Sequence, residues 1–248
     1  MTHDAAAGRF RLAKPELGAW RAGNTGVEGV WHFDSGRPGR HTMIAALIHG
    51  NELSGAVAVS GLLQAGLRPT QGRLTLAFCN LAAFDRFDPG NGDASRFVEQ
   101  DLNRQWTPER LAEGGSLERA RARELAPWVT RADWLLDLHS MHEPSLPLCL
   151  TGLFEESVAL ALALKTPAHI VVDAGHKDGT RMRDHGRFGT AEGMAAGARS
   201  LLVECGFHGD PASVDVARDQ CRRFMVASGV IGGAEFDAAL PGWLQPDA

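Results

Sequence analysis

The feature that most constrains the fold is a regular alternation of short apolar runs with longer segments that have helical spacing. The expected strands cover residues 29–33, 42–48, 72–78, 132–139, 168–172 and 199–204, the first of them as a possible edge strand. The expected helices cover residues 53–63, 107–124, 154–164 and 211–228. Strands that alternate with helices predict an α/β fold with a mixed, mostly parallel central sheet and helices on both faces.

One of these helices carries a clear start signal and many charges. Thr107 is an expected N-cap and Pro108 occupies the first helical position. Charged residues dominate the segment as far as Glu124, so we expect this face of the helix to be solvated.

Composition restricts the classes of protein and partner. The 248 residues, 44% of them hydrophobic, are enough for a substantial core, and we expect residues 1–248 to form a single domain. A formal net charge of -5 without a Lys/Arg-rich run argues against nucleic acid or an anionic membrane as the partner. The N-terminus has no apolar signal region, and no run of about 18 apolar residues exists, so a cytoplasmic protein is expected.

Residues with metal-binding chemistry lie at the ends of three expected strands. His49 and Glu52 follow the strand over 42–48. His139 ends the strand over 132–139, and Glu204 ends the strand over 199–204. Imidazole and carboxylate groups together suit Zn²⁺. Because the ends of parallel strands can meet at one end of a sheet, these residues can supply three ligands and one unligated carboxylate, the composition of a catalytic zinc site.

Each of these residues also has an ordinary interpretation. His49 could be a hydrogen-bonded loop histidine beside a solvated Glu52, and His139 could be a satisfied core histidine. Asp137 lies two residues before His139, so on a strand it faces the same side and could orient a metal ligand. The shared position of these residues at strand ends favours the metal site. The cysteines are widely spaced without a Cys-x-x-Cys pair, so no thiolate zinc site is expected.

Several motifs together resemble those of the aspartoacylase and succinylglutamate desuccinylase family of zinc carboxypeptidase-like hydrolases. The motifs are His49-Gly-Asn-Glu52, Arg96 followed by Asp101-Leu-Asn-Arg104, Asp137-Leu-His-Ser140 and Glu204-Cys-Gly206. Their order and rough spacing fit the family over residues 42–208.

The resemblance implies a role for each motif. It implies three ligands for one Zn²⁺ per chain, namely His49, Glu52 and His139. Glu204 would be the general base and acid, and Arg96 would polarise the scissile carbonyl. Asn103 with Arg104 would hold a substrate carboxylate.

The function implied by the resemblance is a zinc-dependent deacylase that cleaves the amide bond of a small carboxylate-bearing N-acyl amino acid. The fold would be a zinc carboxypeptidase-like catalytic domain, and such a domain could assemble as a homo-oligomer. The alternatives are a zinc carboxypeptidase acting on short peptides and a catalytically inactive zinc-binding interaction module. Glu204 and Arg96 argue against the inactive module, because a binding module needs neither a base nor an oxyanion clamp.

The chain also departs from the family pattern. It ends soon after Glu204, so the C-terminal β domain of longer members is expected to be missing, and it contains no tyrosine. Met194 stands near the point where aspartoacylase has a further carboxylate-binding arginine. Arg181, Arg183 or Arg187 could replace that arginine. We therefore expect a second substrate carboxylate to be recognised weakly.

Overall fold

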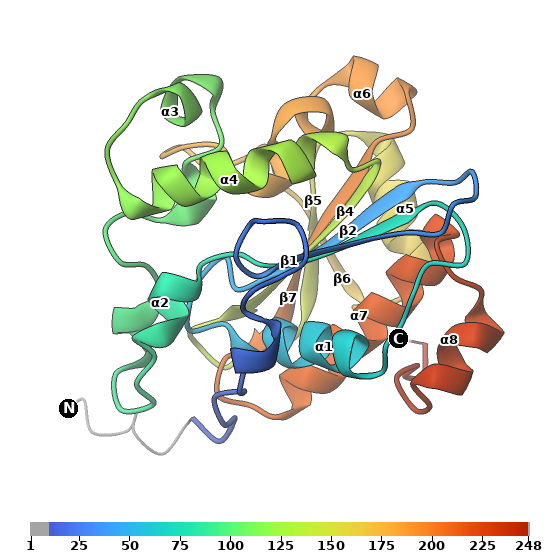
Figure 1. Cartoon of the computed structure of the whole chain (residues 1–248), viewed down its shortest axis with the longest axis horizontal. Coiled ribbons are helices and arrows are strands. Elements are labelled where there is room, and N and C mark those ends of the chain that lie inside the picture. Colours follow the sequence, from blue (N-terminus) through green and yellow to red (C-terminus); the bar gives the residue numbers. More distant parts are fainter. Residues whose placement is uncertain (1–9, 248) are drawn as a thin grey trace.

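The computed structural model describes residues 10–247 and contains a 7-stranded sheet (Figure 1). The strands are β1 (Val30–Asp34), β2 (His41–Ala46), β3 (Arg73–Phe78), β4 (Trp134–Met141), β5 (Leu148–Thr151), β6 (His169–Val172) and β7 (Arg199–Phe207). Their order is β1-β3-β2-β4-β7-β5-β6, so β1 and β6 are the two edge strands.

Most neighbouring strands run parallel. The pairs β3–β2, β2–β4, β4–β7 and β5–β6 are parallel, whereas β1–β3 and β5–β7 are antiparallel. The predicted mixed, mostly parallel sheet is confirmed. Because β2, β4 and β7 are parallel neighbours, their C-terminal ends meet at one end of the sheet, where open α/β sheets hold their ligands.

Helices cover both faces of the sheet (Figure 1). They are α1 (Leu53–Gln64), α2 (Leu81–Asp85), α3 (Pro108–Ala112), α4 (Leu117–Arg131), α5 (Glu155–Leu164), α6 (Ala191–Ala195), α7 (Ala212–Ser228) and α8 (Gly233–Ala239). One hydrophobic cluster joins the sheet to α1, α5 and α7, and a second joins its other face to α4. Side chains of β2 alternate between the two clusters, with Ile44 in the first and Met43 in the second.

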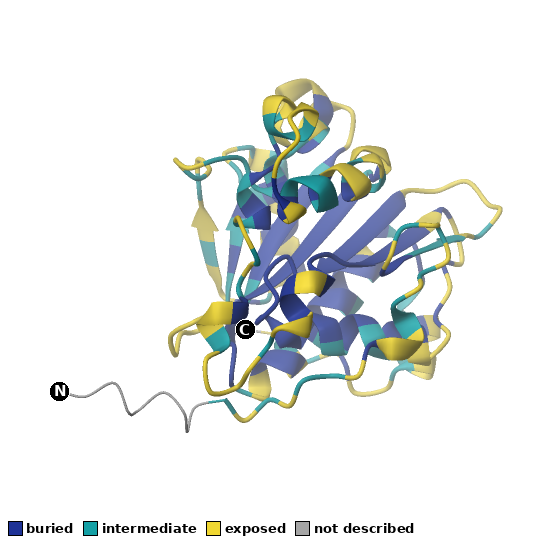
Figure 2. Ribbon diagram, turned by 60° about the vertical axis from the view of Figure 1, so that its left-hand side comes forward, coloured by how far each residue is buried: buried dark blue, intermediate teal, exposed yellow. Residues whose placement is uncertain are grey.

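Burial follows from this layered arrangement. Every residue of β2 is buried, and Figure 2 shows the central strands buried beneath helices whose outer surfaces are exposed. The edge strand β6, by contrast, has a largely exposed surface. None of the helices formed by residues 10–247 has the length and apolar character needed to span a membrane.

The helix predicted over 107–124 is wrong in two respects. Thr107 does cap a helix, accepting a hydrogen bond from Arg110 N, but that helix is α3 and ends at Ala112. The chain then passes through Gly115 at a φ of 143°, a conformation that favours glycine, and Ser116 caps the separate helix α4. The prediction that the charged face is solvated is also wrong at Glu118, which is only 1% exposed.

The strand predictions agree with the structure within a few residues, but one strand was not expected. β5 is four residues long and pairs antiparallel with β7 between Leu148 and Glu204 at one end and Leu150 and Leu202 at the other. It therefore extends the sheet beyond β7 and places Leu148 opposite Glu204.

Candidate metal centre and active site

The loop between β2 and α1 carries the first two candidate ligands. Leu47 has a φ of 57°, an uncommon conformation for a branched residue, and it turns the chain sharply after β2. A Cβ atom at Gly50 would overlap backbone atoms of Ala83 and Phe84, so only glycine allows this close approach. Glu52 lies immediately before α1, where the positive end of the helix favours a carboxylate.

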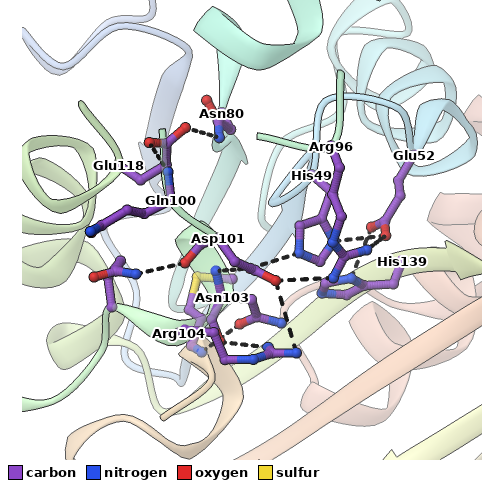
Figure 3. A network of polar contacts seen from close by, with 12 residues as sticks. His49, Glu52, Asn80, Arg96, Gln100, Asp101, Asn103, Arg104, Glu118 and His139 are labelled. Carbon is purple, nitrogen blue, oxygen red and sulfur yellow. Dashed lines mark hydrogen bonds and ion pairs between the residues drawn. The ribbon is translucent and has the colours of Figure 1, made fainter. Parts of the chain in front are cut away.

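The carboxylate of Glu52 lies between two imidazoles. Its Oε1 is 2.7 Å from Nδ1 of His49, and its Oε2 is 2.8 Å from Nδ1 of His139 (Figure 3). All three side chains are at most 3% exposed. One donor atom from each lies within 4.8 Å of the other two, so the three residues could hold a metal ion.

The outer nitrogen of each imidazole faces another carboxylate. Nε2 of His49 is hydrogen-bonded to Oδ1 of Asp101 at 2.9 Å, and Nε2 of His139 lies 2.9 Å from Oδ2 of Asp137. A carboxylate that holds the proton on Nε2 leaves Nδ1 free as a metal ligand and fixes the orientation of the ring. Asp137 thus occupies the position expected from the strand pattern.

The charge of this cluster favours a bound cation. Burial alone would lower the pKa of His139, but the carboxylates of Asp137 and Glu52 raise it well above its usual value. The same attraction would act on a metal ion placed between the ligands. Two imidazole nitrogens and a carboxylate, with further carboxylates behind them, therefore fit a divalent ion such as Zn²⁺ in donor type and in charge.

Glu204 stands beside the candidate ligands. It is the direct partner of His139 in the register of β4 and β7, and it lines the same cavity as His139 and Glu52. Burial raises the pKa of Glu204 to about 7. A carboxyl group with a pKa near neutrality can take up a proton and release it again at physiological pH.

The remaining predicted residues lie on the segment between α2 and α3. Nη2 of Arg96 is 3.1 Å from Oδ2 of Asp101, and Nη1 of Arg96 is 3.9 Å from Oε1 of Glu52. The side chain of Arg96 is 36% exposed, which leaves part of the guanidinium accessible to a ligand. Arg104 is only 16% exposed, and its burial lowers its pKa. The side-chain oxygen of Asn103 accepts a hydrogen bond from Met182 N, so its NH₂ group is the part left for an anion.

A cavity of about 140 Å³ brings these residues together. Its walls include all of the predicted site residues, namely His49, Glu52, Arg96, Asn103, Arg104, His139 and Glu204. Of the three arginines considered as replacements near Met194, Arg181 also lines this cavity. Arg183 instead contacts Asp184, and Arg187 contacts Asp133. A larger cavity of about 530 Å³, beside residues 144–147 and α7, is lined by none of the candidate ligands.

Two contributions to the site could not be assigned from the sequence. Asp101 was matched only as part of a motif, and its contact with His49 depends on how the loop after Arg96 folds back. Arg181 was one of several candidates in a glycine-rich loop, and only the fold shows that it lines the cavity.

The fold and these residues define an α/β protein with a candidate metal centre at the ends of β2, β4 and β7. Residues 38–195 match the sequence profile of the succinylglutamate desuccinylase/aspartoacylase catalytic domain, and the chain belongs to this family. A comparison with curated proteins found no match.

Solved structures with the same fold come from several bacteria. A succinylglutamate desuccinylase/aspartoacylase from Rhodobacter sphaeroides is 22% identical, with a TM-score of 0.59, over 79% of this chain and 58% of its own. The product-bound ectoine utilization protein from Ruegeria pomeroyi is 17% identical, with a TM-score of 0.61, over 82% of this chain and 61% of its own. An aspartoacylase family protein from Mesorhizobium loti is 19% identical, with a TM-score of 0.60, over 82% and 62%. This chain thus spans about three fifths of the length of these proteins.

Proposed function

We propose that this chain is a zinc-dependent hydrolase that cleaves the amide bond of a small, carboxylate-bearing N-acyl amino acid. The observation that carries the proposal is the buried cluster of His49, Glu52 and His139 with Glu204 beside it in one cavity. Membership of the succinylglutamate desuccinylase/aspartoacylase family supports the same reaction class. The three clustered residues would hold one zinc ion, and residues 1–248 would act as a single catalytic domain.

The base and the acid of the reaction are proposed to be the same residue. Bound zinc supplies a Lewis acid that lowers the pKa of water toward about 7. Glu204 would accept the proton of the attacking water and then give it to the nitrogen of the leaving amine. Burial of Glu204 favours the protonated form that returns the proton, whereas a neighbouring zinc ion would favour the ionised form that accepts it.

Arg96 is proposed to stabilise the oxyanion that develops on the scissile carbonyl. Its guanidinium lies near Glu52 and is held by Asp101, so it is oriented before a substrate arrives. A preorganised charge of this kind stabilises the transition state more than the ground state.

Arg104 and Asn103, which line the same cavity, are proposed to bind the substrate carboxylate. Arg104 offers a bidentate fork, and the NH₂ group of Asn103 adds a further donor. Burial, and then the charge of Arg181, lower the pKa of Arg104, and a bound anion would stabilise its charged form. Membership of the succinylglutamate desuccinylase/aspartoacylase family favours the deacylase over the carboxypeptidase.

The metal assignment gives a direct prediction. Purified protein is expected to hold about one zinc ion per chain, and His49→Ala is expected to lose most of it, because one of three ligands is removed. His169→Ala, a change on the exposed edge strand β6, is the matched control and should retain its zinc. Elemental analysis that finds less than about a tenth of an equivalent in wild-type protein after zinc loading would contradict the site.

The substrate assignment gives a second prediction. Amidation of the α-carboxylate of an N-acyl amino acid is expected to lower kcat/KM by roughly 30- to 1,000-fold, because it removes the charge-assisted contact with the half-buried Arg104, a loss of about 2–4 kcal/mol. Arg104→Ala should remove this discrimination, while the control Arg187→Ala, which alters a contact with Asp133, should keep it. Equal rates for acid and amide with wild-type enzyme would discard the Arg104 assignment.

The same kinetic panel tests whether a second carboxylate is recognised. N-acyl amino acids with neutral side chains are expected to be hydrolysed about as well as N-acetylaspartate or N-succinylglutamate, since Met194 stands near the point where aspartoacylase has a further carboxylate-binding arginine. A strong preference for the dicarboxylates that disappears in Arg181→Ala would instead show that Arg181 binds the second carboxylate of the substrate.

A further inference from the structure

Glu118 is an ionisable residue whose surroundings differ from those of the other charged residues of α4. It lies in the first turn of the helix, and it is 1% exposed. It belongs to the same buried stripe as Ala122, Leu125 and Val129. Carboxylates are rarely buried so completely unless their oxygens are satisfied by strong donors.

The donors to Glu118 come from one short stretch of backbone. Its Oε1 accepts a hydrogen bond from Val98 N at 2.7 Å, and its Oε2 accepts from Glu99 N at 3.2 Å and from Gln100 N at 3.0 Å. The side-chain amide of Asn80 adds a bond to Oε1 at 3.3 Å. Figure 3 shows this carboxylate facing Gln100 and Asn80 at the far side of the segment from the metal ligands. Three successive N–H groups directed at one carboxylate form an anion-binding concavity in the backbone.

The segment held in this way joins two residues of the candidate site. Arg96 lies two positions before Val98, and Asp101 follows Gln100 directly. Asp101 in turn contacts both Arg96 and Nε2 of His49. The start of the segment is tied separately, by a hydrogen bond from Gly50 N to the carbonyl of Arg96. Asp101 itself accepts hydrogen bonds from Gln105 Nε2 and Asn103 N, so Glu118 is the anchor of the stretch 98–100 that lies between the two tied ends.

We propose that Glu118 is a positioning residue of the active site, whose carboxylate fixes residues 98–100 and thereby holds Arg96 and Asp101 in place. Glu118 acts through the backbone and does not touch the candidate ligands. Its kinetic consequences rest on the proposed hydrolase function, whereas its effects on the loop and on His49 do not.

Glutamine at this position tests the role of the second oxygen and of the charge. The amide presents only one acceptor oxygen, and its NH₂ group would face backbone N–H donors. In Glu118→Gln, the amides of residues 98–100 are expected to exchange with deuterium at least about tenfold faster than in wild type, while amides of the central strands are unchanged. The zinc dissociation constant should rise by about tenfold, since Asp101 then holds His49 less firmly.

The matched control lies on the same helix. Glu124→Gln removes a partly exposed carboxylate that pairs with Arg121, and it should leave both readouts at the wild-type values. Unchanged exchange of residues 98–100 in Glu118→Gln would overturn the proposal. If Glu118→Gln does not fold, the exchange of residues 98–100 is measured in Glu118→Asp, which keeps the charge on a shorter side chain. Unchanged exchange in that variant would likewise overturn the proposal.

Kinetics separates positioning from general stabilisation. In Glu118→Gln, kcat is expected to fall at least about tenfold while KM changes by less than about threefold. Combined with Arg96→Ala, the loss should be smaller than the product of the two single losses, because both changes act on the same guanidinium. Losses that multiply fully would overturn the coupling to Arg96. If wild-type protein hydrolyses no N-acyl amino acid, the proposed function fails, and the exchange and zinc measurements alone decide the role of Glu118.

Discussion

Replacing Glu204 with glutamine is expected to lower kcat by about 10²–10⁴-fold while the protein keeps about one zinc ion per chain. The side chain remains nearly the same size, so the packing between β4 and β7 should persist. The amide, however, cannot accept a proton from water or return one to the leaving amine. Glu204 is outside the set of three clustered ligand residues, which is why its chemistry can be separated from metal binding.

The experiment compares turnover and metal content in the same preparations. Glu155→Gln, at the exposed start of α5, is the matched control and should keep wild-type values of both. Retained zinc with lost turnover would support Glu204 as base and acid. Loss of zinc in Glu204→Gln would make this residue a ligand, and a wild-type rate would assign the proton transfer to another group.

The central strands could be predicted because burial on both faces leaves a continuous apolar run. Residues 42–48 have this pattern where β2 lies, and β4 contains the shorter apolar run 134–136. β5 has no such signal, since only four residues follow a polar, proline-containing stretch and every second one is only partly buried. Its place in the sheet depends on pairing with β7, which lies about fifty residues further along the chain, and local sequence patterns do not contain that information.

The candidate ligands could be predicted for a similar reason. His49, His139 and Glu204 each follow or end a recognisable strand, and parallel strands bring such positions together. Asp101 and Glu118 could not be found in this way, because their contacts depend on an irregular loop. Helical spacing did contain a signal for Glu118, which lies four residues before Ala122 on the buried stripe of α4. A charged residue on such a stripe indicates a buried polar contact.

Arg96→Ala is expected to lower kcat by about 10²–10³-fold, a loss of roughly 2.7–4 kcal/mol of transition-state stabilisation, with a much smaller rise in KM. The neutral carbonyl of the substrate gains little from a guanidinium, whereas the oxyanion formed from it carries a full charge. Arg104 should show the opposite pattern, because the carboxylate that it binds is charged throughout the reaction.

The contrast between the two arginines provides the decisive measurement. kcat and KM are determined for Arg96→Ala and Arg104→Ala with the same N-acyl amino acid, and Arg187→Ala serves as a control outside the cavity. If Arg96→Ala raises KM and leaves kcat intact, Arg96 binds a ground-state carboxylate and the oxyanion needs another donor. The geometry favours a loss in kcat for Arg96→Ala. Nη1 of Arg96 is 3.9 Å from the candidate ligand Glu52, and its partner Asp101 also holds His49, so the charge of Arg96 is fixed beside the metal ligands.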